Sequence, residues 1–186
     1  MLDHTLSFLL SQVNDHLGTR YPSKEPHVVL SGLSTLEGTT PPEIVNRVVM
    51  SLINVEREGA AGSAGVPVRT ESGAFVRTSQ ALNLNLYILV SASFSNYVEA
   101  LKLLSAVLGY FQGKPVFNAQ SAASFPKGLD RLTMEIVNLD IQQLNNVWGN
   151  FGGKYLPSVL YKARMFTLQE GWVVEQVPPI SGIEVK

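Results

Sequence analysis

Residues 144–166, LNNVWGNFGGKYLPSVLYKARMF, form the stretch that decides the fold. The order of residue types predicts a short amphipathic helix, a stop at two glycines, a Lys-Tyr-Leu-Pro corner and then a β-strand. The distinctive residues are aromatics, glycines and a proline, which determine shape and offer almost no reactive groups. The stretch therefore indicates a packing or assembly element in an α+β domain rather than an active site.

Length and charge narrow the class of protein. The chain has 186 residues, enough for one domain with a substantial core. Charged residues make up only 16%, against about 25% in ordinary soluble domains, and the formal net charge is -1. Such a chain has no long-range field to gather nucleic acid or an anionic membrane. A charge-poor surface also repels its own copies little, which favours oligomers, although a monomer with a Ser/Asn-rich surface fits equally well.

Cysteine is absent from the sequence, which excludes disulfides, thiol nucleophiles and cysteine-bound metals and fits a reducing compartment. The first ten residues, MLDHTLSFLL, have no basic leader and no small-residue cleavage site, so they do not resemble a signal peptide. The longest apolar runs, such as residues 86–90, are far shorter than the roughly 20 residues of a membrane-spanning helix. We therefore expect synthesis and folding in the cytosol, without membrane insertion.

Three segments have the apolar spacing of amphipathic helices. The first lies at the start of the chain and should stop near Gly18. The second should begin after Asn96, which is a good N-cap residue, and end before Gly113. Asp140 should cap a short third helix. The apolar side of this third helix consists of Leu144, Val147, Trp148 and Phe151.

Seven segments are rich in strand-forming residues. They cover residues 27–31, 45–56, 81–91, 115–118, 131–139, 158–168 and 171–177. In residues 81–91, strict alternation of apolar and polar side chains predicts a strand with one buried face. The glycine-rich residues 58–79 favour a loop or a hairpin tip. Together the elements predict one α+β domain over residues 1–186, with helices packed on a mixed or mostly antiparallel sheet.

Patterns for catalysis or ligand binding are weak. The only histidines are His4, His16 and His27, and the first two lie about 120° apart around the first helix, so they cannot share a metal on one face. The Gly-Lys pairs do not continue into a phosphate-binding loop. Trp148 and Tyr155 could stack on a ligand, but Trp148 lies on the apolar side of its helix and fits a core position better. We predict no catalytic, metal-binding or cofactor-binding residues.

Residues 171–186 form a candidate interaction tail. They are apolar and extended beside a Pro-Pro break, which suits the addition of a strand to another subunit's sheet edge. An ordinary edge strand of the same subunit is an equal alternative. The candidate interface residues of this tail are Trp172, Val174, Val177 and Ile180.

Long blocks of the sequence carry a family resemblance. They cover residues 82–118, residues 131–168 (RLTMEIVNLDIQQLNNVWGNFGGKYLPSVLYKARMFTL) and, more loosely, residues 48–58 (VVMSLINVERE). These blocks resemble the N-terminal domain family of the cap, or tail-terminator, proteins of contractile injection systems, the phage-tail-like particles of bacteria. The glycine-rich residues 58–79 depart from the family pattern. Seven residues match the family motif position by position and are carried over as scaffold: Trp148, Gly152, Lys154, Tyr155, Pro157, Ser158 and Tyr161.

The resemblance implies a structural protein without catalytic residues or cofactors. Such a protein forms a six-fold ring of identical chains at the tail end distal to the baseplate, where it ends the inner tube and anchors the last sheath ring. The implied partners are the tube and sheath proteins of the same particle. The implied place is the cytoplasm of the producing bacterium, before any release of the particle. Two rivals are a scaffold or peptide-binding module with an exposed sheet edge, and a small enzyme with converging carboxylates.

Overall fold

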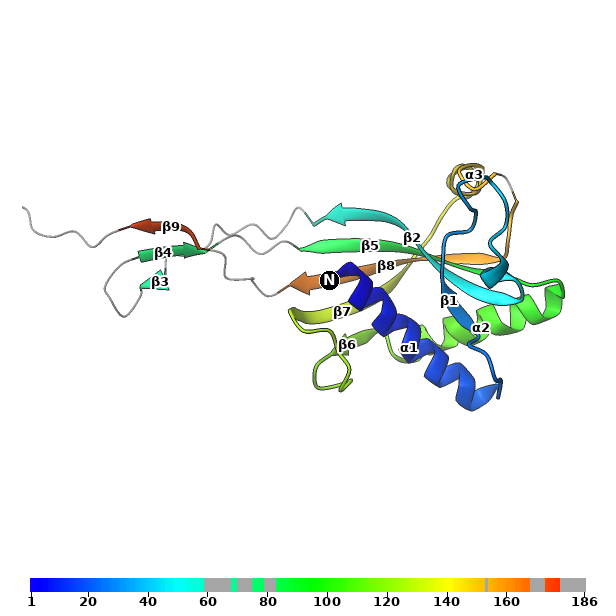
Figure 1. Ribbon diagram of the computed structural model, residues 1–186, viewed down its shortest axis with the longest axis horizontal. Helices are drawn as coiled ribbons and strands as arrows, with labels where there is room; N and C mark the ends of the chain where they lie inside the picture. The colour runs from blue at the N-terminus through cyan, green and yellow to red at the C-terminus, as the bar shows by residue number, and fades with distance from the viewer. Residues whose placement is uncertain (59–67, 70–74, 79–82, 153, 168–172, 178–186) are drawn as a thin grey trace, which may run out of the picture.

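The computed structural model describes residues 1–58, 68–69, 75–78, 83–152, 154–167 and 173–177. In these ranges the chain forms three α-helices, one short 3₁₀ helix and nine strands (Figure 1). In chain order they are α1 (Leu2–Arg20), β1 (Val28–Leu30), η1 (Pro42–Ile44), β2 (Arg47–Arg57), β3 (Val68–Arg69), β4 (Phe75–Thr78), β5 (Leu84–Ser93), α2 (Tyr97–Gly113), β6 (Val116–Asn118), β7 (Leu129–Val137), α3 (Ile141–Gly149), β8 (Ser158–Thr167) and β9 (Val173–Val177).

A six-stranded mixed sheet, in the order β1-β2-β5-β8-β7-β6, is the centre of the fold. The β1–β2 pair is parallel, and the other neighbours in this sheet are antiparallel. The helices α1 and α2 cover one face, and α3 lies on the other (Figure 1). The predicted α+β class, with helices packed on a mixed or mostly antiparallel sheet, is confirmed. No helix in the described ranges has both the length and the hydropathy to cross a membrane.

The inner core lies between the sheet and the first two helices. Its apolar side chains alternate along the central strands, as Leu86, Ile88 and Val90 do in β5. Phe8 of α1 packs edge-on against Phe117, with ring centroids 5.6 Å apart. Burial of this apolar surface supplies most of the driving force for folding.

A side-chain amide joins the edge of the sheet to α1. Asn14 donates from Nδ2 to the Val28 carbonyl and accepts from the Val28 N–H, both at 2.9 Å. The amide thus takes the place of a neighbouring strand on the open side of β1, which explains how a three-residue edge strand remains paired.

The predicted helix starts are confirmed, but all three ends are corrected. α2 includes Gly113 instead of ending before it, and α3 ends at Gly149, before Phe151 and the two glycines that were expected to stop it. Asn96 Oδ1 accepts from the N–H groups of Val98 and Glu99 and caps α2. Asp140 and Gln143 form a reciprocal capping box on α3. The first helix, however, continues past Gly18 to Arg20, because Gly18 keeps helical backbone and has open space around it. Glycine permits a helix to end but does not require it.

The prediction of one buried face for residues 81–91 is wrong. In β5, Asn85, Leu89 and Ser91 point away from the inner core, yet each is at most 2% exposed. Part of the cover comes from α3 and from the loop before β2, which are distant in sequence. Both faces of this central strand are therefore covered along most of its length.

The remaining strand predictions differ from the structure mainly at their ends. Residues 115–118 contain β6, and the strand predicted at 131–139 is β7, which begins at Leu129 and ends at Val137. The register of β7 against β8 shifts once, between Leu129 and Arg131. The glycine-rich segment contains β3 and β4, which pair as antiparallel strands; its other residues, 59–67, 70–74 and 79, lie outside the described ranges.

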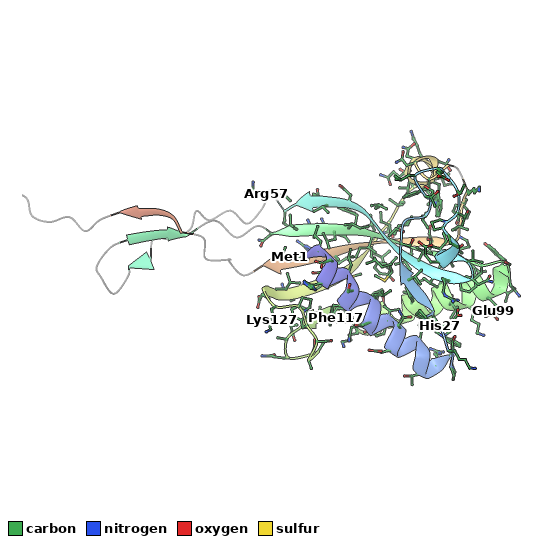
Figure 2. All side chains as sticks on the ribbon, in the orientation of Figure 1. Met1, His27, Arg57, Glu99, Phe117 and Lys127 are labelled. Carbon is green, nitrogen blue, oxygen red and sulfur yellow. The ribbon has the colours of Figure 1, made fainter. Side chains whose placement is uncertain are left out.

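A second, three-stranded sheet has the order β3-β4-β9. It lies beyond the end of the large sheet at which β2 and β8 finish and β5 begins (Figure 1). Arg57 marks the end of β2 on this side (Figure 2). In the small sheet β9 pairs antiparallel with β4 of the same chain, with Val177 opposite Phe75.

Candidate assembly interface

The outer face of the large sheet, opposite α1 and α2, is divided into an apolar half and a charged half. The apolar half contains Val49, Leu89 and Leu160, which lie beneath Trp148 of α3. The charged half begins one register step further along the strands, where Tyr87 of β5 lies opposite Lys162 of β8. Side chains on one face of adjacent strands contact each other across the sheet. The two halves therefore form one continuous surface of mixed chemistry.

Trp148 is the centre of the apolar half. Its side chain is 4% exposed, so the interpretation as a core residue is confirmed. The ring packs at a steep angle against Phe151 and Tyr155, with centroids 6.1 and 5.6 Å away. Tyr155 is itself 57% exposed. We call Trp148, Phe151 and Tyr155 the aromatic corner. Their ring contacts connect the buried cluster to the surface.

The predicted scaffold residues after Trp148 shape the connection from α3 to β8. Gly152 has a φ of 78°, a left-handed conformation that favours glycine. Pro157 is buried, and its carbonyl accepts from the Ala92 N–H at 2.9 Å. Ser158 begins β8 opposite Ser91 of β5. These residues therefore position the start of β8 beside the end of β5.

Tyr161, the last scaffold residue, lies in the other layer. It is 1% exposed in the inner core, and its ring is 5.0 Å from that of Phe111. Burial raises the pKa of its phenol to about 12. Its hydroxyl has no hydrogen-bond partner among the described residues. Tyr161 therefore stabilises the core by packing and takes no part in a surface site.

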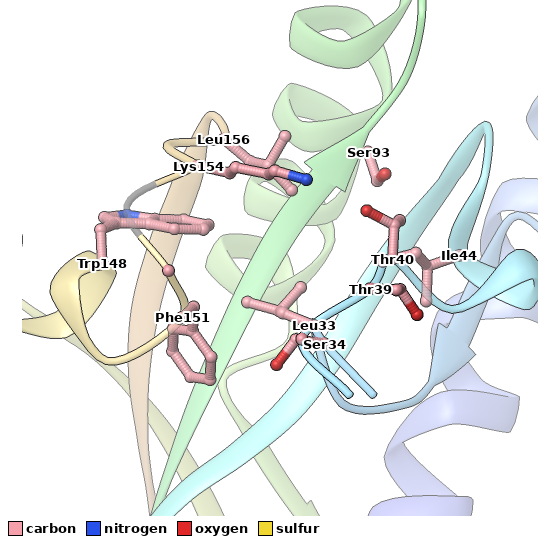
Figure 3. Close-up of a pocket in the computed structure, with 12 residues that line it drawn as sticks. Leu33, Ser34, Thr39, Thr40, Ile44, Ser93, Trp148, Phe151, Lys154 and Leu156 are labelled. Carbon is pink, nitrogen blue, oxygen red and sulfur yellow. The ribbon is translucent and has the colours of Figure 1, made fainter. Parts of the chain in front are cut away.

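A hollow of about 110 Å³ opens between α3 and the loop before β2 (Figure 3). Its apolar wall includes Trp148, Phe151 and Leu156. The opposite side presents the hydroxyls of Thr39, Thr40 and Ser93, with Leu33, Ser34 and Ile44 beside them. Lys154 extends across the opening, and its Nζ points toward Thr40 and Ser93 (Figure 3). The hollow thus combines an apolar wall with one cation.

The charged half is a ladder of side chains across four strands. Arg164 Nη2 donates to Glu58 Oε1 at 2.7 Å, and Arg164 Nη1 lies 3.4 Å from Glu135 Oε1. The Tyr87 hydroxyl donates to Glu56 at 2.7 Å. Asn85, 2% exposed, lies between Glu58 and Lys162, and its amide satisfies both when its nitrogen faces Glu58. The ladder is nearly neutral, because its acids and bases are paired.

These contacts change proton affinities in the direction expected for charge pairs. The hydrogen bond from Arg164 lowers the pKa of the Glu58 carboxyl and raises that of Arg164 itself. The hydrogen bond to Glu56 raises the pKa of the Tyr87 phenol. These shifts leave Glu58 ionised, Arg164 protonated and Tyr87 neutral at pH 7, which is typical of structural contacts and not of a general acid or base.

The candidate tail residues are only partly within the described structure. Val174 and Val177 belong to β9, which pairs with β4 of the same chain. Trp172 and Ile180 lie outside the described residues.

The histidines lie at separate places. His4 is beside Asp3, His16 stacks on Tyr110 with centroids 4.9 Å apart, and the His27 Nε2 lies 2.6 Å from the Tyr21 carbonyl. Across the described ranges, no group of three or more His, Cys, Asp or Glu side chains could hold a metal ion.

Sequence reasoning identified the aromatic corner but missed the hollow and the charged ladder. Alternation of Lys162 and Arg164 with apolar residues was a signal for a polar strand face. The partners Glu56, Glu58 and Glu135 come from other strands, and their register is not readable from one sequence.

Comparison with known proteins gives one family and several chains of solved structures, two of which are described here. A model of the family described as Pvc16 N-terminal domain matches residues 3–182. A chain of the PVC sheath/tube terminator, from an extracellular contractile injection system in the extended state, matches with a TM-score of 0.56 at 14% identity, over 96% of this chain and 62% of that chain. The cap of the anti-feeding prophage, a tube-terminating cap, matches with a TM-score of 0.55 at 14% identity, over 100% of this chain and 60% of that chain.

At this identity the two structures share the fold with the chain, which spans about three fifths of their length. A search of functionally curated proteins found no match.

Proposed function

The chain belongs to the Pvc16 N-terminal domain family, and from this membership we propose that it caps the tail of a contractile injection system. In this role it ends growth of the inner tube and anchors the terminal sheath ring. The observation that carries the proposal is the family match over residues 3–182. The fold supports it, because two solved structures with the same fold are a sheath/tube terminator and a tube-terminating cap.

We propose a ring of six identical chains as the assembled form. A terminator must offer one surface that fits the last subunits of the polymer and an opposite surface that accepts none. A head-to-tail contact that closes into a ring meets this requirement for a finite assembly. The partners are the tube and sheath proteins of the same particle, and assembly takes place in the cytoplasm of the producing bacterium, before any release of the particle.

The surface supports association with other protein chains. At the start of α2, Tyr97, Val98 and Leu101 are 61%, 70% and 43% exposed. Adjacent exposed apolar side chains of this size are typical of contact surfaces. The chain is also nearly neutral, so there is little electrostatic repulsion to prevent its surface from associating with another protein.

The role includes no bond-making step. The charged side chains of the outer face are paired with each other, and the hollow is smaller than the roughly 300 Å³ at which small-molecule pockets begin. Turnover of a small molecule by the purified chain would contradict this part of the proposal.

Deletion of the gene in the producing strain tests the function. Tail lengths are measured by electron microscopy in the wild type, the deletion strain and the deletion strain with a plasmid copy. We expect irregular, unterminated tubes in the deletion strain and normal lengths after complementation. Normally terminated tails in the deletion strain would refute the proposal, as would particles that never contain the chain.

We also propose that residues 171–186 take part in ring or sheath attachment through Trp172, Val174, Val177 and Ile180. Removal of residues 171–186 should leave a folded protein that no longer enters particles. Removal of residues 178–186 alone is the matched shorter truncation, since it removes Ile180 but keeps β9 and its pairing with β4, and it should reduce entry into particles less. Full occupancy in particles after the longer truncation would contradict the assignment.

A peptide-binding module is the second candidate, because one sheet edge is open. Within the described structure β1 pairs only with residues 48–50, so the rest of β2 has no strand partner on that side. Such an edge can accept an extended peptide. Binding of unrelated extended peptides by the purified chain, together with normal tails in the deletion strain, would favour this candidate.

A further inference from the structure

The loop before β2 carries a leucine that is completely exposed, at 109% of its reference area. This residue, Leu36, lies at the tip of a turn with well-defined hydrogen bonds. Thr35 N–H donates to the Thr39 carbonyl at 2.8 Å, and Gly38 N–H donates to the Thr35 carbonyl at 3.0 Å. The two threonine hydroxyls are also 2.8 Å apart. A leucine held on an ordered turn loses little conformational freedom on binding, which suits a contact residue.

Glu37, next to Leu36, has a free carboxylate. Among the residues that the structure describes, five exposed apolar residues have an acid directly beside them in sequence: Leu36, Val55, Val98, Ile136 and Ile141. In four of these pairs the acid is occupied by a partner: Glu56 by Tyr87, Glu99 by Lys102, Glu135 by Arg164 and Asp140 by Gln143. Glu37 makes no ion pair or hydrogen bond with any described residue. We call Leu36 and Glu37 the knob.

The hollow beside α3 has the complementary chemistry. A volume of about 110 Å³ corresponds to roughly three or four water molecules, which is room for one side chain and too little for a cofactor. Its lining includes Trp148 and Phe151 but no acidic residue. Lys154 at its opening has no ion pair within the described part of the chain. We call Trp148, Phe151 and Lys154, with the loop residues facing them, the socket.

We propose that two copies of the chain pair through these features, so that Leu36 of each copy enters the socket of the other and Glu37 meets Lys154. The complete exposure of Leu36 means that it does not fill the socket of its own chain. Gly38 and Thr39 line the socket and belong to the same loop as the knob, so the two features lie side by side. Adjacent, complementary features permit a reciprocal two-fold contact. This pairing goes beyond the proposed cap, because it concerns the chain outside the particle.

Charge reversal tests the contact. Purified Glu37→Lys, Lys154→Glu and the wild-type chain are compared by sedimentation equilibrium at near-physiological salt. Each two-fold pair contains the contact twice, so we expect each single reversal to raise the dissociation constant by at least about tenfold. An equimolar mixture of the two variants should pair again, since both contacts then join opposite charges. The chain that carries both reversals should also pair.

Two further variants separate the loss of this contact from a general effect of changing the net charge. Leu36→Ala removes the apolar anchor without a charge change and should also weaken pairing. Lys127→Glu has the same net charge change as Lys154→Glu at an exposed site at the far end of the sheet, and should leave pairing unchanged (Figure 2). Circular dichroism checks that every variant is folded. A wild-type chain that stays monomeric, single reversals without effect, or a mixture that does not pair would overturn the inference, as would a mass of six copies.

Discussion

Replacement of Trp148 by alanine tests the structural role of the aromatic corner. The side chain is 4% exposed, so its loss removes nearly the whole buried surface of a tryptophan. Such core substitutions cost about 3 to 5 kcal/mol. The ring also loses two steep aromatic contacts, with Phe151 and Tyr155, each worth roughly 0.5 to 1.5 kcal/mol. The adjacent hollow admits water and allows the site to relax, so we expect a total loss near the lower end, about 3 kcal/mol.

Trp148→Phe is the matched control. It keeps an aromatic ring, and it removes no hydrogen bond, since the indole N–H has no partner among the described residues. We expect a loss of about 1 kcal/mol. Urea unfolding at neutral pH, followed by circular dichroism, measures both free energies of unfolding. A loss below about 1 kcal/mol for alanine, or an equal loss for both variants, would refute the role of the ring as the centre of the outer cluster.

Two more predictions concern polar groups of the sheet. Tyr161→Phe should leave the free energy of unfolding unchanged or raise it by up to about 1 kcal/mol, because it removes a buried hydroxyl without a partner in the described residues; a clear loss in urea unfolding would show that the hydroxyl is bonded. Arg164 lowers the pKa of Glu58, so the stability that this pair contributes is present above the ordinary carboxyl pKa of roughly 4.3 and is lost as pH falls through the lowered value. Glu58→Gln should therefore reduce the melting temperature at pH 7 and much less at pH 3, and an equal reduction at both pH values would contradict the pairing.

Local chemistry made the helix starts predictable. Asn96 and Asp140 both cap their helices, because a capping side chain bonds to N–H groups within three residues of it. The end of α1 was harder to predict, since Gly18 is compatible with both a helix end and a helix interior. A helix start that depends on a specific side-chain hydrogen bond can therefore be predicted from the sequence. A helix end cannot be predicted where the residue is compatible with both a helical and a non-helical backbone.

Features that depend on distant segments could not be predicted from one sequence. Residues 81–91 alternate like a strand with one solvated face, but α3 and the loop before β2 help to bury the polar side of β5. The partnership of Arg164 with Glu58 likewise depends on the register of β2, β5 and β8. The aromatic corner could be recognised because its shape-determining residues lie close together in one segment of the sequence, whereas the hollow needs Lys154 and Thr40 from separate segments.

The arrangement of strand ends has a mechanical consequence. At one end of the large sheet β2, β5 and β8 lie side by side, and the small sheet lies beyond them (Figure 1). A pull on the small sheet along the long axis of the molecule would stretch these three strands along their own length. Because the three strands are pulled from the same end, the load falls on the ladders that join them to β1 and β7. The bonds of these ladders run across the strands, so they are sheared together instead of opening one after another. If the chain serves in the proposed cap, this arrangement would resist sudden tension on the small sheet.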